Sequence, residues 1–416
     1  MTMIRAASEA VVSELMRSGL NKDLLSPAGS IRYDERIASY FSLTAQKKPF
    51  CFVHPKTTED VALILKAILA NPEGPLRHPQ RWPRLVSIQP GARWRDVYKH
   101  LGDAHGEVAG LLTGGGISWY IPRVGFCGVQ LVNAEVILAD GRVVHANNDE
   151  HADLWRALKG ASAGNFGIVT RFDVRALPND GLWAGTLRSE ATPGYSADYV
   201  GAMKSQFKDV ITTTFLANTK GVESPPELRR LCNIPTLHRD LKQTNLHDFA
   251  CSMDQPMGMH NFWHTTTFLN DERIMNKAVE LHAVAVRYRL ITAAWATSAA
   301  EMLWVWTRPS AGGGNAIMLM LLINVGGEEP AEARDVGYRA ARAFYEGVEA
   351  FAREVDGFVD WTYLNYADRA QNPLRSLLDP EEVRRTALKY DPEGVFRRRA
   401  PGGFKISEYE AEGVRG

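Results

Sequence analysis

Two glycine-rich stretches are the parts of this chain whose residue types point most directly to chemistry. They read Gly114-Gly115-Gly116-Ile117-Ser118 and Gly160-Ala161-Ser162-Ala163-Gly164-Asn165-Phe166-Gly167. Glycine lets the backbone turn sharply and approach a ligand closely, so N–H groups in such stretches can bind the phosphates of a dinucleotide. Residue types alone also allow the simpler interpretation, in which both stretches form tight turns and bind nothing.

A third candidate is the segment TYLNYAD, which holds Tyr363, Asn365, Tyr366 and Asp368. In an extended strand the first two side chains would share one face, and the last two would share the other. A phenol, with its pKa of about 10, acts as a base only when a neighbouring group assists it. The alternative is a buried aromatic strand whose hydroxyls are merely hydrogen-bonded.

Spacing excludes several other chemistries. No Gly-Lys-Ser/Thr follows either glycine-rich stretch, and Trp119 stands where a dinucleotide fingerprint needs its third glycine. His260 and His264 lack an accompanying glutamate, and Trp263 with the threonines that follow indicates a strand, so we predict no metal site. No Gly-x-Ser-x-Gly or Cys/His arrangement supports acyl transfer.

The elements around the glycines follow from local patterns in residues 131–178. Asp140-Gly141 lies between two apolar runs and predicts a hairpin closed by a type I′ turn. Residues 147–149 are candidate N-caps for a short helix, which Gly160 would end as a left-handed cap. Alternating apolar positions from Asn165 onward then predict a strand. This segment is therefore an α+β unit with a glycine turn between helix and strand.

Elsewhere the pattern is helical over residues 1–45, with a turn at residues 26–29, and irregular over the proline-rich residues 71–84. Further elements with clear periodicity are a helix that Thr57 or Thr58 can cap and that runs to Leu69, helices at residues 271–289 and 331–353, and a strand at residues 317–325.

Composition sets limits on location and partners. A chain of 416 residues normally forms two domains or lobes. Lys+Arg and Asp+Glu balance at 48 each, so no basic field attracts nucleic acid. The longest apolar run, residues 316–323, is far below the roughly 20 residues that span a bilayer. Without a signal-peptide pattern or paired cysteines, we expect a cytoplasmic protein that binds neither nucleic acid nor membrane.

Taken in order, these segments resemble the FAD-linked oxidoreductases of the berberine-bridge-enzyme-like group. This group belongs to the vanillyl-alcohol-oxidase superfamily and is abundant in fungal secondary metabolism. The resemblance is carried by residues 131–178 together with PFCFVHPKTTEDV (49–61), VSIQPGARWRDVY (86–98), GGGISWYIPRVGF (114–126), YLNYAD (363–368), KYDPEGVF (389–396) and PGGF (401–404).

The resemblance implies an α+β, two-domain PCMH-type FAD-binding fold with a mixed-sheet substrate domain and a C-terminal berberine-bridge-like segment. The implied boundaries are an N-terminal helical segment at 1–45, a shortened FAD-binding domain at 46–180, a substrate domain at 181–360, and a C-terminal segment at 361–406 that returns to the FAD domain.

The resemblance also implies roles for particular residues. In the family both glycine stretches lie against FAD, and a tyrosine in the YLNYAD segment can take a substrate proton or orient the substrate. The implied catalytic residues are Tyr366 and Tyr363. The implied cofactor-binding residues are Gly114, Gly115, Gly116, Ser118, Gly160, Asn165, Gly167, Ile168 and Asn365.

The chain departs from the family in two places. The family's Ser-Gly-Gly-His loop, whose histidine often bonds the flavin, has no counterpart in residues 71–84, because His78 is surrounded by prolines and Arg77. The family's next glycine-rich turn, which can carry a cysteine linkage, is missing before Leu111. We therefore expect FAD to bind non-covalently. The alternatives are a reading frame that omits coding sequence, or a protein that has lost FAD.

The expected activity is an FAD-dependent oxidation of a small natural-product intermediate in a secondary-metabolite pathway. The substrate would pass a hydride to flavin N5 while a base removes the accompanying proton, and O2 would reoxidise the flavin. The alternative is a non-redox cyclase or an inactive scaffold on the same fold.

Overall fold

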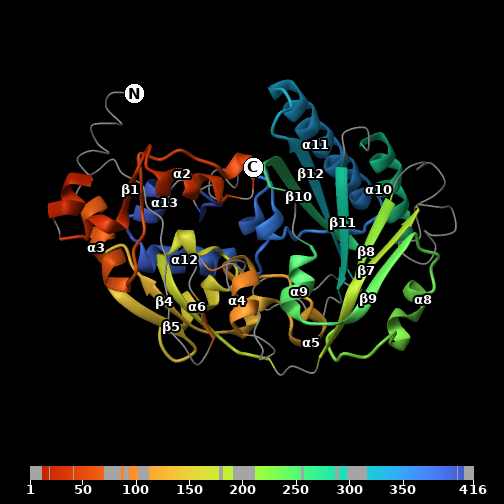
Figure 1. Cartoon of the computed structure of the whole chain (residues 1–416), viewed down its shortest axis with the longest axis horizontal. Coiled ribbons are helices and arrows are strands. Elements are labelled where there is room, and N and C mark those ends of the chain that lie inside the picture. Colours follow the sequence, from red (N-terminus) through yellow and green to blue (C-terminus); the bar gives the residue numbers. More distant parts are fainter. Residues whose placement is uncertain are drawn as a thin grey trace.

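The structure is a computed structural model that describes residues 12–17, 19–40, 42–69, 86–88, 92, 94–101, 112–177, 181–190, 211–253, 257–285, 290–297, 316–400 and 402–406. Two lobes lie side by side (Figure 1). Each lobe combines antiparallel sheets with helices, as the predicted α+β class requires. The predicted boundaries at residues 45, 180 and 360 stay predictions.

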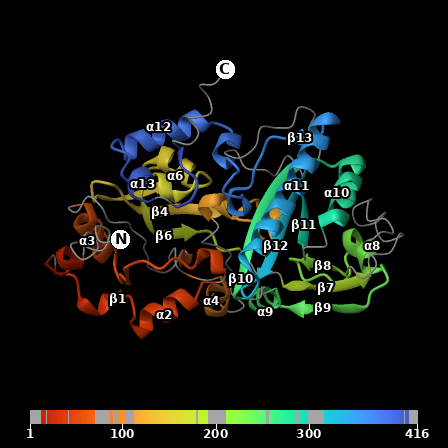
Figure 2. The same ribbon diagram turned by 90° about the horizontal axis from the view of Figure 1, so that it is seen from above.

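The first lobe contains sheets in the orders β1-β2 and β3-β6-β4-β5. Their bounds are β1 Leu25–Pro27, β2 Cys51–Val53, β3 Val86–Ile88, β4 Leu131–Ile137, β5 Val143–Asn147 and β6 Ile168–Val174. Helices α6 (Ala152–Leu158) and α12 (Pro380–Tyr390) cover one face of the larger sheet, whereas α2 (Ile31–Ala38) and α3 (Thr58–Leu69) lie on its other side (Figure 2). An apolar core fills the space under α6 and α12.

The second lobe contains sheets in the orders β11-β12-β10-β13 and β8-β7-β9. Their bounds are β7 Leu182–Glu190, β8 Ile211–Asn218, β9 His238–Thr244, β10 Met259–Leu269, β11 Leu290–Thr297, β12 Ala316–Gly326 and β13 Phe358–Val359. Helices α10 (Glu272–Ala285) and α11 (Ala331–Glu354) pack on β10 and β12 through one apolar cluster. The predicted mixed sheet is antiparallel throughout its described strands.

Shorter helices complete the described chain. They are α4 Trp94–Leu101, α5 Ile121–Val124, α8 Arg229–Cys232, α9 Leu246–Cys251 and α13 Val395–Arg399, with 3₁₀ turns at Lys22–Leu24, Leu43–Ala45, Leu112–Gly114, Cys127–Gln130, Ala163–Asn165, Pro226–Leu228, Leu364–Tyr366 and Pro373–Ser376. None of the described helices is long and apolar enough to cross a membrane.

The strongly periodic predictions are confirmed over the residues that the structure describes. Helices α3, α10 and α11 and strand β12 lie where apolar periodicity predicted them. In the N-terminal segment the predicted turn is confirmed by a hydrogen bond from Ser30 N to the Pro27 carbonyl, 3.1 Å long. The purely helical prediction for that segment is wrong at β1, because residues 25–27 pair with β2.

The predicted hairpin is confirmed, but its predicted turn type is wrong. Strands β4 and β5 pair from Ile137↔Val143 to Asn133↔Asn147. A type I′ turn needs positive φ at both central residues, yet only Gly141 (φ +84°) has it and Asp140 does not. The loop is longer than two residues because the Asp140 carboxylate accepts a hydrogen bond from Arg142 N (3.0 Å) and stabilises a wider turn.

The caps predicted for α6 are also wrong. Asn147 accepts hydrogen bonds from the backbone N–H groups of Asp149 and Glu150, which forms a local turn and leaves His151 as the N-cap residue. Gly160 does not adopt positive φ. Instead Gly160 N and Ala161 N both donate to the Ala157 carbonyl, so the helix end tightens without a left-handed residue.

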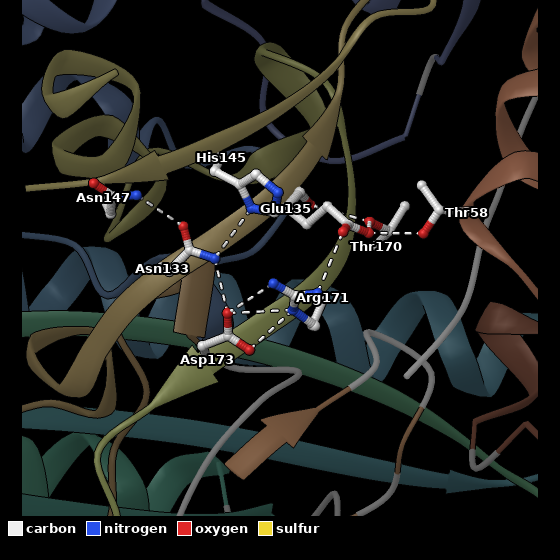
Figure 3. A network of polar contacts seen from close by, with 8 residues as sticks. All are labelled: Thr58, Asn133, Glu135, His145, Asn147, Thr170, Arg171 and Asp173. Atoms are coloured by element: carbon white, nitrogen blue, oxygen red, sulfur yellow. Dashed lines mark hydrogen bonds and ion pairs between the residues drawn. The ribbon is translucent and has the colours of Figure 1, made fainter. Parts of the chain in front are cut away.

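A polar network occupies the face of the β4–β5–β6 sheet opposite the apolar core (Figure 3). The Glu135 carboxylate accepts hydrogen bonds from Thr58 on α3 (2.7 Å) and from Thr170 on β6. Arg171 pairs with both Glu135 (3.4 Å) and Asp173 (3.0 Å). These charged side chains are at most 20% exposed. The network therefore joins α3 to the sheet through groups that water reaches poorly.

Removing the Glu135 carboxylate should destabilise the fold, because Arg171 would lose a partner while still largely buried. For Glu135→Ala we expect the free energy of unfolding to fall by about 1–3 kcal/mol. The matched control is Glu346→Ala, which breaks an exposed pair with Arg342 on α11 and should cost less than about 1 kcal/mol. Urea unfolding followed by circular dichroism measures both. Equal losses in the two variants would contradict the structural role of the network.

Candidate flavin site

The segment that carries the tyrosines meets the first glycine-rich stretch. Tyr363 is completely buried, and its hydroxyl accepts hydrogen bonds from Ile117 N and from Asn365 Nδ2, each 2.9 Å long. A Cβ at Gly114 would overlap the side-chain amide of Asn365. The predicted site residues Gly114, Tyr363 and Asn365 thus lie together, with Ile117 beside them. Ile117 and Tyr363 are 246 positions apart in the sequence.

The segment is not the strand that the sequence predicted. Residues 364–366 form a 3₁₀ turn, closed by hydrogen bonds from Tyr366 N to the Tyr363 carbonyl (3.1 Å) and from Ala367 N to the Leu364 carbonyl (3.3 Å). The alternation of faces predicted for an extended chain therefore does not apply. Residues in a turn can direct side chains into both lobes at once.

The first glycine stretch presents unpaired backbone donors. Gly115 and Gly116 have φ of +100° and +83°, a conformation that favours glycine. Their carbonyls accept hydrogen bonds from the N–H groups of Gly128 (2.6 Å) and Cys127 (2.9 Å). Within the described part of the chain, no group accepts from the N–H groups of Gly116 and Ser118. Gly116 is buried, and a buried N–H without an acceptor points to a ligand.

The second glycine stretch lies beside the first. Ser162 N donates to the Thr113 carbonyl over 2.9 Å. Ser162 itself has φ +65° and ψ +123°, which is strained for a residue with a side chain. Such strain costs on the order of 1–3 kcal/mol and concentrates at functional sites. Sequence reasoning did not single out Ser162, because nothing in its residue type signals the backbone conformation.

Gly167 and Ile168 act mainly in packing. A Cβ at Gly167 would lie 2.8 Å from the Ile137 carbonyl oxygen, so glycine lets the chain press against β4. Ile168 pairs with Ile137 and packs in the apolar cluster that joins α3 to the sheet. Contact of these two residues with a cofactor stays a prediction.

Asn165 binds the C-terminal segment. Its amide nitrogen donates to the carbonyls of Ala161 and Phe404, both at 3.0 Å, and its oxygen accepts from Ile406 N at 3.3 Å. The side chain is 5% exposed, so these bonds use most of its capacity. We interpret Asn165 as an anchor for residues 402–406, which leaves only backbone groups of this turn for a cofactor.

Tyr366 stands out from Tyr363 because its hydroxyl is unpaired. Its ring stacks on Trp263 of β10, with ring centroids 5.1 Å apart and planes 17° from parallel, and it meets the Tyr363 ring edge-on. Burial raises the pKa of both phenols. No described group hydrogen-bonds the Tyr366 hydroxyl. In the sequence Trp263 indicates only a strand, because its contact with Tyr366 depends on tertiary folding.

Solved structures establish the class of fold. The chain superposes on a glucooligosaccharide oxidase from Acremonium strictum with a TM-score of 0.71 and 17% identity, covering 93% of this chain and 96% of that one. Berberine bridge enzyme in complex with (S)-reticuline gives a TM-score of 0.69 at 13% identity, with 93% and 97% covered. The fold is therefore that of the berberine-bridge-like oxidases of the vanillyl-alcohol-oxidase superfamily, as the sequence resemblance implied.

A sequence relative narrows this class. The FAD-dependent monooxygenase sdcF of Emericella nidulans is 31% identical over 476 aligned positions, which cover 95% of this chain and 99% of the relative. No protein-family model matches the chain. The chain belongs to this family of FAD-dependent oxidoreductases of fungal secondary metabolism.

The alignment also bears on the missing loops. Its 476 positions exceed the 416 residues of this chain by 60, so at least that many positions are gaps in this chain. The two intervals where the family loops were missing, residues 71–84 and the stretch before Leu111, lie outside the described residues.

The contact between Gly114 and Asn365 yields a test of the assembled site. Gly114→Ala should displace the Asn365 amide and with it the Tyr363 hydrogen bonds, so we expect FAD affinity to fall at least tenfold. Gly326→Ala is the control, because a Cβ there meets only a flexible Glu329 side chain at 3.4 Å. Titration of FAD fluorescence measures both. Unchanged affinity in Gly114→Ala would separate this contact from cofactor binding.

Proposed function

We propose that this protein is an FAD-dependent oxidoreductase that oxidises a small, partly aromatic natural-product intermediate. The observation that carries the proposal is the buried N–H of Gly116, which has no acceptor among the described residues and precedes Ile117, whose own N–H donates to the Tyr363 hydroxyl. Family membership supports the same conclusion, because the relative is named an FAD-dependent monooxygenase.

The residues present fit a flavin. The N–H groups of Gly116 and Ser118 would donate to its polar ring edge, while Tyr366 would face the reacting carbon of the substrate. When bound, FAD would supply the two-electron oxidation of the substrate, with O2 as the final electron acceptor in this proposal. The base that takes the accompanying substrate proton is Tyr366 in this proposal, because no described group occupies its hydroxyl, whereas the Tyr363 hydroxyl is hydrogen-bonded to Ile117 N and Asn365. Burial raises the pKa of Tyr366, so a polar group of the bound flavin would have to assist it. Tyr363 would hold the backbone of Ile117 rather than touch substrate.

The second lobe offers polar groups for substrate binding. Asn261, Trp263 and Thr265 alternate along β10 and so share one face, opposite the face that packs on α11. Asn261 Oδ1 and Thr265 Oγ1 are buried there without a hydrogen-bond partner among the described residues. Buried polar atoms are usually paired, so these two support a ligand that carries hydroxyl or N–H groups beside an aromatic ring.

The proposal extends to the oxidant, the attachment and the location. O2 would be the electron acceptor, and the fate of its oxygen separates an oxidase, which releases one H2O2 per product, from a monooxygenase, which inserts an oxygen atom.

We propose non-covalent FAD, because the family's histidine and cysteine attachment positions have no counterpart. All four cysteines are free thiols, which suits the proposed cytoplasmic location.

An absorbance spectrum tests the proposal most simply. The purified full-length protein should show flavin bands between about 300 and 550 nm, and acid precipitation should release the colour into the supernatant if attachment is non-covalent. Protein that stays colourless after incubation with FAD would contradict the redox function. Colour retained in the pellet would contradict only the non-covalent attachment.

A second test concerns Tyr366. With any substrate that the wild-type protein oxidises, Tyr366→Phe should keep its colour and lose kcat by about 10²–10⁴-fold, the usual contribution of a general base. Because burial raises the pKa of this phenol, its basic form grows as pH rises, so wild-type activity should increase into the alkaline range. The variant should lack that increase. If activity still increases with pH in Tyr366→Phe, the base is another residue. The same pH profile of Tyr363→Phe then tests whether that residue is Tyr363.

A further inference from the structure

A side chain takes the place of a missing strand at the edge of β10. Strand β13 pairs with β10 only at Thr267 and Phe268. Two residues earlier, the peptide of Thr265 is paired by the amide of Gln371 instead. Thr265 N donates to Gln371 Oε1 over 3.2 Å, and Gln371 Nε2 donates to the Thr265 carbonyl over 2.7 Å. The amide thus makes both hydrogen bonds that a neighbouring strand would make.

Each end of the Gln371 amide makes a second hydrogen bond as well. Its oxygen also accepts from Asp368 N (3.0 Å), and its nitrogen also donates to the Tyr345 hydroxyl (2.8 Å). That hydroxyl in turn donates to Glu349 on α11 over 2.6 Å. Four hydrogen bonds fill the capacity of an amide, and they fix which end is nitrogen. No smaller or purely apolar side chain could satisfy the same groups.

The Gln371 hydrogen bonds join the two segments that carry the stacked rings of Trp263 and Tyr366. Trp263 precedes Thr265 by two residues on the same strand, and Tyr366 precedes Gln371 by five residues on the segment that crosses between the lobes. Asp368 adds a second attachment, because its carboxylate accepts from the Tyr338 hydroxyl of α11 over 2.8 Å. The 3₁₀ turn that carries Tyr366 is therefore held against the second lobe on the side away from Tyr363.

We propose that Gln371 is the positioning residue that holds Tyr366 over Trp263, and so sets where the Tyr366 hydroxyl stands relative to substrate. The inference rests on the proposed function for its catalytic consequence, but the geometry it predicts does not require turnover. If Gln371 had only a structural role, replacing it would lower stability but leave the Trp263–Tyr366 pair intact in the fraction of the protein that folds.

Near-ultraviolet circular dichroism measures the pair directly, because stacked aromatic rings contribute strongly to it. The difference between wild type and Tyr366→Leu, which removes the ring, defines the signal of the pair. In Gln371→Leu we expect at least half of that signal to be lost at a temperature where far-ultraviolet dichroism shows the protein folded. Gln371→Glu keeps the shape and the acceptor but loses both donors, so it replaces the leucine variant if that one does not fold.

Gln243→Leu is the matched control. Gln243 lies on β9, is exposed, and donates to the Gly221 carbonyl over 2.8 Å, far from Tyr366 in the fold. This variant should leave the dichroism signal unchanged. In protein that oxidises a substrate, the Gln371 variants should lose kcat at least tenfold while KM changes less than threefold and flavin content stays the same.

The outcomes separate the two proposals. A folded Gln371 variant with the full dichroism signal, or with unchanged kcat, overturns the positioning role. A protein that binds no FAD overturns the proposed function, while the dichroism experiment still decides whether Gln371 positions Tyr366.

Discussion

The arrangement of this molecule depends on one hydrogen bond, from Ile117 N to the Tyr363 hydroxyl. A completely buried phenol must find a partner, and this one finds it in the backbone of the first glycine stretch. The bond ties the segment after β13 to the first lobe, while Gln371 ties the same segment to the second. This short stretch of chain therefore links the two lobes at the site, beside other links such as the hydrogen bond from Arg123 to the Thr219 carbonyl (2.7 Å).

The same stretch explains why the two tyrosines differ. The Tyr363 hydroxyl accepts hydrogen bonds from Ile117 N and Asn365, and burial raises its pKa, so Tyr363 serves as a fixed support. Tyr366 lies in the same cluster with Ile117 and Phe126 but keeps its hydroxyl unpaired. Among the described residues, polar atoms without a partner come from both lobes: the N–H groups of Gly116 and Ser118 from the first, and Asn261 Oδ1 and Thr265 Oγ1 from the second. A bound cofactor and substrate would supply the hydrogen-bond partners that these groups lack.

How much of this the sequence could predict depends on the range of the interactions. The hairpin, helix α11 and strand β12 follow from local periodicity and were predicted closely. The hairpin turn was wrong because Asp140 bonds to Arg142, a side-chain effect that competes with the Asp-Gly signal. The strand predicted at Tyr363 was wrong because the chain leaves the sheet after two residues of β13. Residue type could not distinguish extended aromatic residues from a 3₁₀ turn.

The site residues divide in the same way. Resemblance to the family brought the two glycine stretches and the tyrosines to attention, and the structure places Gly114 against Asn365. Trp263, Ser162 and Gln371 were missed, because their roles arise from contacts across 100 residues or more or from backbone strain. For Asn165 the family motif marks the residue, but only the fold shows that its amide binds the C-terminal segment.

The central claim is that a flavin lies between the first glycine stretch and Tyr366. A crystal structure of the protein grown with FAD tests it most directly. We expect flavin density with the ring edge within hydrogen-bond distance of Gly116 N and Ser118 N and one ring face toward Tyr366. Crystals without flavin at this position, or with these N–H groups paired to the chain itself, would contradict the account.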